Sequence, residues 1–201
     1  MGRTSDEIAD ELLELVDALG RLVDGHRRAG GLEEGLQPIH LRALAYLGRA
    51  NRYSNTPAAL AEWLGQTKGS VSQSLLLLEA RGLVVKTPDA GDGRVVRLAL
   101  AARGRALLAR LERDTDWAGA VTDLAEDEAG RAADALRGLL AGLQRRRGHQ
   151  TFGVCKTCRH FRSEAGGGMR CGLTGDVLRA RDVVKLCREH AAPEVAGAPP
   201  A

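Results

Sequence analysis

The feature that most constrains this chain is the segment 56–104, TPAALAEWLGQTKGSVSQSLLLLEARGLVVKTPDAGDGRVVRLALAARG. Thr56 and Pro57 predict a helix start, because a hydroxyl can cap the first turn and proline suits the first helical position. Gly65 ends this short helix. Thr67 caps a second helix, which stops at Gly82. Two short helices joined by a tight turn are thus predicted at the centre of the chain.

A β-hairpin is predicted directly after these helices. The runs 83–85 and 95–98 are rich in valine, as strands are, and the turn cluster PDAGDG separates them. A helix-turn-helix followed by such a hairpin is typical of winged helix-turn-helix proteins that bind DNA. The predicted second helix would then be the recognition helix, whose amino end meets base edges in the major groove.

The sequence of this second helix divides into two faces. Val71, Leu75 and Leu78 recur at helical spacing and predict a buried face. The small or hydrogen-bonding residues gather at the amino end: Thr67, Lys68, Gly69, Ser70, Ser72, Gln73 and Ser74. Gln73 can pair bidentately with adenine, whereas Lys68 suits a phosphate. The alternative is a capped helix end that faces solvent.

The hairpin tip carries a second candidate DNA contact. Arg94 follows Asp92 and Gly93 there, and an arginine at a wing tip can enter a narrow minor groove. The carboxylate of Asp92 could orient the guanidinium by hydrogen bonding. An ordinary turn with a surface salt bridge is the alternative, but the position after a helix-turn-helix favours the DNA contact.

The pattern LAEWLGQTKGSVSQSLLLLEARGLV followed by DGRVVRLALAARGRALL resembles the MarR family of winged-helix regulators. The likeness covers residues 5–147 in element order. It implies a homodimer, held by interlocked N- and C-terminal helices, that binds a pseudo-palindromic site on double-stranded DNA. It also implies Arg94 as the minor-groove residue, Asp92 as its partner, and repression relieved by a small-molecule or redox effector. One departure is Leu100-Ala101, where family members usually have a threonine cap.

The remaining patterns predict a mainly α-helical fold with one small hairpin. We expect helices over 5–24, from residue 38, over 102–116 and over 123–147, with a loop at 25–37. Residues 1–148 would form the DNA-binding and dimerisation domain. Residues 149–190 would form a small metal-stapled C-terminal module, and residues 191–201 a disordered tail.

All four cysteines fall in that C-terminal module: Cys155, Cys158, Cys171 and Cys187. The C-x-x-C pair and the small size of the segment favour a metal staple. Zn²⁺ and an iron–sulfur cluster, such as 4Fe–4S, are both open, as are four reduced thiols without metal. If Cys171 is not a ligand, His190 could complete the set. Otherwise His160 and His190 would lie outside it.

Composition and charge narrow the class of protein. The chain has 201 residues, 44% hydrophobic residues and a net charge of +3, all compatible with a soluble globular protein. No apolar run could cross a bilayer, and the acidic N-terminus lacks signal-peptide features, so we expect a cytoplasmic protein with reduced thiols. We find neither a nucleophile–base set nor a phosphate-binding glycine loop in the sequence, so we do not expect an enzyme. The alternatives are a metal-dependent interaction adaptor tethered to DNA and a redox enzyme that uses the cysteines.

Overall fold

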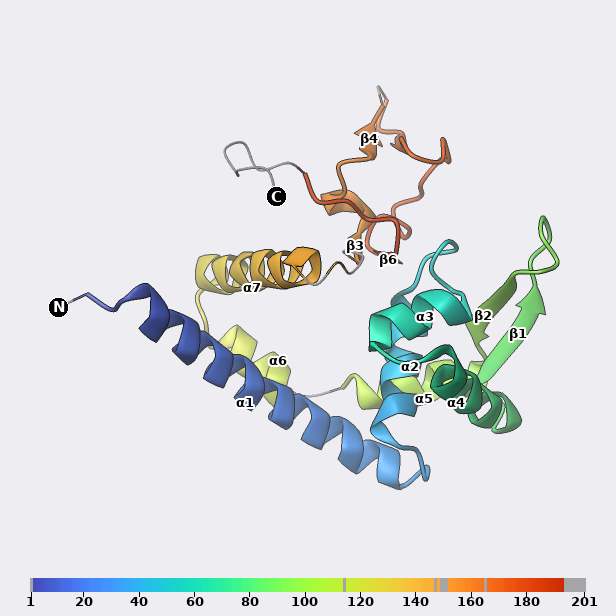
Figure 1. The fold of residues 1–201 in the computed structure, drawn as a ribbon, viewed down its shortest axis with the longest axis horizontal. Coiled ribbons are helices and arrows are strands. Elements are labelled where there is room, and N and C mark those ends of the chain that lie inside the picture. The colour runs from blue at the N-terminus through green and yellow to red at the C-terminus, as the bar shows by residue number, and fades with distance from the viewer. Residues whose placement is uncertain (1, 114, 147, 149–151, 165, 194–201) are drawn as a thin grey trace.

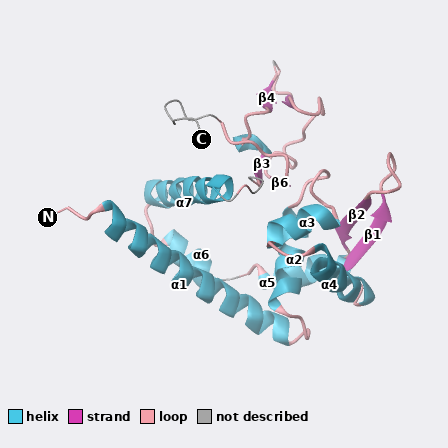
Figure 2. Ribbon diagram, viewed as in Figure 1, coloured by secondary structure: helices cyan, strands magenta, loops and turns pink. Residues whose placement is uncertain are grey.

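The computed structural model describes residues 2–113, 115–146, 148, 152–164 and 166–193. Figure 1 labels its helices and most of its strands, and Figure 2 separates helices from strands by colour. The elements are α1 (Ser5–Leu32), α2 (Pro38–Arg49), α3 (Pro57–Leu64), α4 (Lys68–Ala80), β1 (Val84–Pro88), β2 (Val96–Leu100), α5 (Ala102–Leu111), α6 (Thr115–Thr122), α7 (Glu126–Arg146), β3 (Gly153–Val154), β4 (Phe161–Ser163), β5 (Met169–Cys171) and β6 (Leu186–Cys187). The predicted mainly helical fold with a small hairpin is confirmed.

The helix-turn-helix forms where its start and stop signals predict it. The hydroxyl of Thr56 accepts a hydrogen bond from the Ala59 N–H at 3.2 Å, which caps α3. Gly65 ends α3 with a φ of 60°, a left-handed conformation that glycine adopts without strain. The hydroxyl of Thr67 caps α4 by accepting from the Ser70 N–H, also at 3.2 Å. Local capping chemistry therefore fixes the lengths of both helices.

The wing is an antiparallel hairpin of β1 and β2. The strands pair from Val84 opposite Leu100 to Pro88 opposite Val96, slightly longer than the valine runs indicated. Alternate residues of β2, Leu98 and Leu100, are buried, and Ala99 between them is exposed. The hairpin is therefore anchored by one face at its base, and its tip projects away from the body (Figure 1).

One hydrophobic core holds the winged helix together. It is built from α2, α3, α4, the hairpin base and α5, with Tyr46, Leu44, Leu60 and Leu78 almost fully buried. Two residues of the C-terminal module, Phe152 and Leu186, belong to the same cluster. The cysteine-rich segment therefore packs against the winged helix through shared core residues.

The first helix is longer than predicted. We expected it to end at Gly25 and a loop to span 25–37, but α1 continues to Leu32. Gly30 and Gly31 pack against other elements, since a Cβ on Gly30 would lie 2.4 Å from the Leu111 side chain and one on Gly31 would lie 2.5 Å from the Leu41 side chain. Tertiary packing thus overrides the low helix propensity of glycine. The chain instead turns at Gly35, which has a φ of 58°.

The helices after the wing also differ from the sequence prediction. The expected helix over 102–116 ends at Leu111, and a separate short helix, α6, follows it. The last predicted helix begins at Glu126 instead of 123. Ala101 precedes α5 with no side-chain cap, as the departure at Leu100-Ala101 implied. The end of that last helix at residue 147 lies outside the described residues.

Helices α1 and α7 expose apolar faces. Only Gly31 is buried in α1, and none of the described residues of α7 is buried. Large side chains that remain exposed on these two helices include Ile8, Leu12, Leu15, Leu19, Leu136, Leu139, Leu140 and Leu143. Both helices extend to the side of the molecule away from the wing (Figure 1). No helix within the described ranges has the length and apolar content that a membrane span requires.

The C-terminal module is built from very short strands. β3 pairs with β6 and β4 pairs with β5, both antiparallel, and a single 3₁₀ turn covers Cys155–Thr157. The module lies above α3, at the end of the loop that joins α2 to α3 (Figure 1). Of the predicted tail 191–201, residues 194–201 lie outside the described part of the chain. The boundaries 1–148 and 149–190 stay predictions.

Candidate nucleic-acid interface and cysteine cavity

The amino-terminal half of α4 presents a polar, exposed surface. Thr67, Lys68, Gly69, Ser70, Ser72 and Gln73, the residues predicted to contact DNA from this helix, are all exposed. On the opposite face Val71 is 1% exposed, and Leu75 and Leu78 are as deeply buried. The core therefore holds the helix firmly while its polar residues face solvent.

Ser74 differs from its neighbours. It is buried, and its hydroxyl donates to the Ser70 carbonyl oxygen at 3.1 Å, so it does not belong to the exposed face on which the sequence placed it. A serine that bonds back to the preceding turn satisfies its own hydroxyl.

Arg94 and Asp92 both lie at the exposed tip of the wing. The Oδ1 atom of Asp92 accepts a hydrogen bond from the backbone N–H of Arg94 at 3.0 Å. This bond shapes the turn, whereas the sequence predicted an interaction with the guanidinium. No residue in the described ranges forms an ion pair with Arg94, so its side chain extends from the tip with its charge available.

A second arginine, Arg97 on β2, binds the turn of the wing, and the sequence analysis did not identify it. The Arg97 Nε atom donates to Asp89 Oδ2 at 2.6 Å. The hydrogen bond from Arg97 lowers the pKa of the Asp89 carboxyl, with further bonds from the N–H groups of Gly91 and Asp92. Asp89 therefore stays ionised and holds the turn against β2. An arginine within an otherwise apolar strand is the signal that could have identified it.

The four cysteines line one small cavity in the C-terminal module. Its volume is about 20 Å³, close to the space of one water molecule. Cys155, Cys158, Cys171 and Cys187 all border it, together with His160 and, from the α2–α3 loop, Tyr53. Cys187 is buried and the other three are half-buried. The fold thus gathers thiols that lie 32 positions apart in the sequence.

Two of these thiols interact directly. Hydrogen bonding from the Cys155 thiol lowers the pKa of Cys187, and the same bond raises the pKa of Cys155. The backbone N–H of Ala191 lies 3.5 Å from the Cys158 sulfur. Donors of this kind stabilise thiolates, the form of cysteine that binds metal.

The four cysteine sulfurs around the cavity are donor atoms that a thiol-binding metal prefers. Among the described residues, no three His, Cys, Asp or Glu side chains converge on a single point that would hold one ion. The sulfurs surround the cavity, so a single ion would draw them further inward. The two histidines differ in position. His160 borders the cavity, whereas the Nε2 atom of His190 lies 3.1 Å from both oxygens of Thr157.

Comparison with known proteins identifies the central fold. The sequence model described as the MarR family matches residues 34–95. Residues 34–95 are a MarR family domain. The match spans the end of the turn before α2, the helix-turn-helix, β1 and the wing tip, and it ends just before β2 begins at Val96. No curated protein has a significantly similar sequence.

Solved structures share the fold of the MarR family domain and its flanking helices. A MepR variant from a multidrug-resistant S. aureus clinical isolate is 22% identical, with a TM-score of 0.60, and the match covers 72% of this chain and 100% of that one. The S. aureus MepR–DNA complex is 20% identical, with a TM-score of 0.53 and coverages of 70% and 99%. CouR from Rhodococcus jostii RHA1, bound to p-coumaroyl-CoA, is 22% identical, with a TM-score of 0.54 and coverages of 65% and 92%. At these identities the likeness shows the fold.

Proposed function

We propose that this chain is a sequence-specific DNA-binding transcriptional regulator that represses promoters as a homodimer. The observation that carries the proposal is the exposed polar face of α4 beside an arginine-tipped wing, both held by one core. A helix in the major groove and an arginine in the neighbouring minor groove would read one continuous stretch of DNA. The MarR family domain supports this function, since that family consists of DNA-binding regulators.

The partners follow from the same fold. MepR has been solved with DNA, and CouR with p-coumaroyl-CoA. By analogy, we infer that this chain binds a pseudo-palindromic duplex and responds to a small-molecule or redox effector. A cytoplasmic location is part of the same proposal.

The homodimer is supported by the unpaired apolar faces of α1 and α7. Leu12 and Leu15 on α1 are 42% and 52% exposed, and Leu136 and Leu140 on α7 are 45% and 49% exposed. A soluble monomer rarely leaves so many large apolar side chains in contact with water. We therefore infer that these helices pack against their counterparts in a second copy of the chain.

The cysteine cavity would hold a thiolate-bound metal centre. Its donor set of four thiols is typical of Zn²⁺ and of iron–sulfur clusters. Cys155, Cys158, Cys171 and Cys187 would be the ligands, with His160 beside them. Metal analysis and the absorption spectrum of protein purified without oxygen distinguish Zn²⁺ from an iron–sulfur cluster. A colourless protein with one zinc per chain indicates a zinc site, and a brown protein with iron and sulfide indicates a cluster.

DNA selection tests the proposed function. The full chain is used to enrich duplexes from a random library, and the affinity for the enriched duplex is compared with that for random DNA. We expect Arg94→Ala to weaken binding and to reduce the salt dependence of log K by about one unit, because one DNA contact is lost.

Arg131→Ala is the matched control, since Arg131 lies exposed on α7, far from α4 and the wing. Its affinity should equal that of the wild type. Equal affinity of the Arg94 variant and the wild type at moderate salt would remove Arg94 from the interface. A library that yields no enriched sequence would contradict the proposal as a whole.

A further inference from the structure

The cysteine module is fastened to the loop between α2 and α3. We call residues 50–55 the coupling loop. The backbone N–H of Asn51 donates to the Leu186 carbonyl at 2.9 Å, next to a β-bridge between Ala50 and Leu186. Beside the loop, Arg188 forms two hydrogen bonds of 2.7 Å with the carboxylate of Glu62 on α3. The module therefore contacts the first helix of the helix-turn-helix and the loop that precedes it.

Two contacts between the coupling loop and the C-terminal module lie next to cysteines. The Asn51 amide nitrogen is 4.0 Å from the Cys155 sulfur. Arg188 directly follows Cys187, and its backbone N–H donates to the Ser54 hydroxyl oxygen at 2.7 Å. Ser54 is fully buried and donates in turn to Asn51 Oδ1 at 2.8 Å. The cavity and the coupling loop thus share a continuous set of hydrogen bonds.

The other end of the coupling loop is bonded to the wing. The backbone N–H of Leu98 donates to the Asn55 carbonyl at 2.8 Å, and the Asn55 amide donates back to the Leu98 carbonyl at 3.2 Å. The Arg97 guanidinium donates to the Arg52 carbonyl at 2.5 Å and to Asn55 Oδ1 at 3.3 Å. A displacement of the coupling loop would therefore stretch or break hydrogen bonds to β2.

From β2 the bonds continue to the tip. Arg97 also binds Asp89, whose Oδ1 atom accepts from the N–H groups of Gly91 and Asp92 at 2.9 and 3.1 Å. Asp92 in turn accepts from the Arg94 N–H. The position of Arg94, the proposed minor-groove residue, is therefore tied to the Arg97 side chain and through it to the coupling loop.

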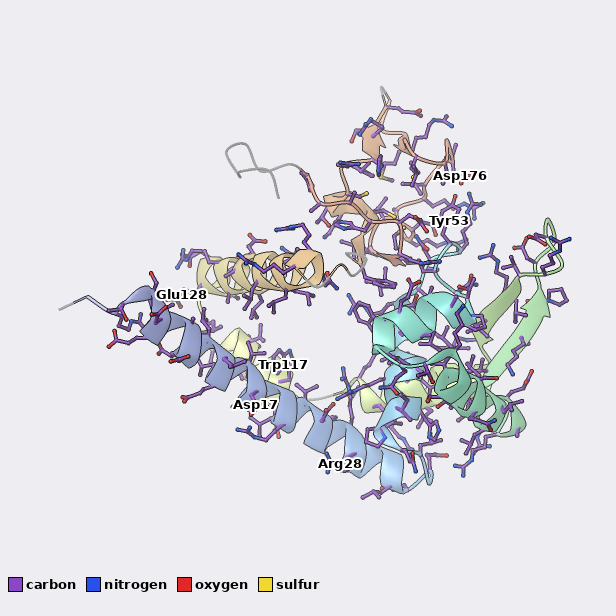
Figure 3. The ribbon with its side chains drawn as sticks, viewed as in Figure 1. Asp17, Arg28, Tyr53, Trp117, Glu128 and Asp176 are labelled. Carbon is purple, nitrogen blue, oxygen red and sulfur yellow. The ribbon has the colours of Figure 1, made fainter. Side chains whose placement is uncertain are left out.

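Figure 3 shows the outer part of this junction, where Tyr53 and Asp176 approach each other from the two sides. The Tyr53 hydroxyl lies 3.1 Å from Thr174 Oγ1, and Arg52 forms an ion pair of 2.5 Å with Asp176. Tyr53 also borders the cysteine cavity. These contacts lie at the surface and add to the buried connection through Ser54.

We propose that metal occupancy of the cysteine cavity controls DNA affinity through the coupling loop, the occupied state being the one that binds DNA. The proposal rests on the proposed function. An occupant fixes the spacing of Cys155 and Cys187. The contact of Asn51 with the Cys155 sulfur and the hydrogen bond from the Arg188 N–H to Ser54 both depend on that spacing. Loss of the occupant releases the loop and, with it, Arg97 and the wing tip. Typical couplings between two sites change affinity by about 5- to 150-fold, and we expect a change in that range.

The test compares metal-loaded and metal-free full-length protein. Protein is stripped with a chelator and a reductant, then reloaded with Zn²⁺ alone or with ferrous iron and sulfide. Affinity is measured for the duplex selected with loaded protein and for a random duplex. Hydrogen exchange of residues 50–55 and 89–97, without DNA, gives an independent readout. We expect the loaded form to bind the selected duplex at least fivefold more tightly and to protect both segments.

Ser54→Ala tests the route. The variant lacks the oxygen that accepts from the Arg188 N–H and the proton donated to Asn51, so its affinity should respond to metal much less than that of the wild type. Ser163→Ala is the matched control, because Ser163 is exposed on β4 in the same module. It should respond as the wild type does. If Ser54→Ala does not fold, Glu62→Gln, which weakens the Arg188 pair, replaces it.

Each outcome decides one claim. If no sequence is enriched, the proposed function fails and the coupling fails with it. If specific binding is found but is equal for loaded and stripped protein, or if the chain takes up neither metal, the coupling is wrong and DNA binding stands. If Ser54→Ala and Glu62→Gln both retain the full metal response, the coupling does not pass through this loop and the proposal is overturned.

Discussion

Replacement of Phe152 tests whether the C-terminal segment is part of the winged-helix core. Its ring centroid lies 6.2 Å from that of Tyr46 and 5.3 Å from that of Trp63, with interplanar angles of 75° and 74°. The side chain is only 8% exposed. Phe152 is therefore the point at which the chain returning from α7 closes the end of the core over α2 and α3.

The expected cost of Phe152→Ala follows from this packing. Truncation of a buried phenylalanine costs about 3–5 kcal/mol. The upper part of that range applies, because the Tyr46 hydroxyl donates to the Ser54 carbonyl at 2.7 Å and so cannot move to fill the space. Phe152→Leu keeps most of the volume and loses two edge-to-face contacts of about 0.5–1.5 kcal/mol each, which gives about 1–3 kcal/mol.

Urea unfolding measures both variants. Tryptophan fluorescence reports on Trp63 and on Trp117 of α6, and far-ultraviolet circular dichroism reports on the helices. One protein concentration must be used throughout, because dimerisation contributes to apparent stability. We expect the two signals to change together and the alanine variant to unfold at a clearly lower urea concentration than the leucine variant. An alanine variant within about 1 kcal/mol of the wild type would refute the packing argument.

Two further predictions concern stability. Gly104→Ala places a Cβ 2.1 Å from the Leu83 carbonyl oxygen and should cost about 1–3 kcal/mol in urea unfolding, whereas Gly130→Ala, with open space around it, should be neutral or stabilising. Equal effects would contradict this steric reading. Burial, aided by the charge of Arg81, lowers the pKa of His40 below its usual 6.5, and neutral His40 Nδ1 accepts from the Gln37 N–H at 3.0 Å. The unfolded chain then binds the proton first, so stability should fall as pH drops below about 6.5, and His40→Gln should reduce this loss in thermal melts at pH 7.5 and 5.5. A loss of the same size in both proteins would exclude His40 as its cause.

The sequence predicts best where structure depends on local chemistry. Thr56, Thr67, Gly65 and Gly82 mark the helix ends because capping and left-handed turns involve neighbouring residues. The exposed face of α4 follows from helical periodicity alone, apart from Ser74. These are interactions over a few positions, which a linear sequence displays directly.

The features missed depend on contacts between distant segments. The extension of α1 through Gly31 requires Leu41, and the role of Arg97 requires Asp89 together with the Arg52 carbonyl. The cysteine spacing predicted one site, and the four thiols do border one cavity. Nothing in the spacing indicated that this cavity would lie against the coupling loop. Such placement is set by tertiary packing, which local patterns do not encode.

The shared core has a consequence for the order in which the protein matures. A ribosome adds about 5–20 residues per second, so Leu186 follows Leu111, the last core residue of α5, by roughly 4–15 s. During this interval the nascent winged helix lacks Phe152 over Tyr46, and Asn51 has no Leu186 carbonyl to bind. The contacts that fasten the coupling loop and the core to residues 152–187 therefore form only after the segment that carries the thiols has been made. A newly synthesised winged helix therefore lacks these contacts until the module that carries the cysteines has followed it out of the ribosome.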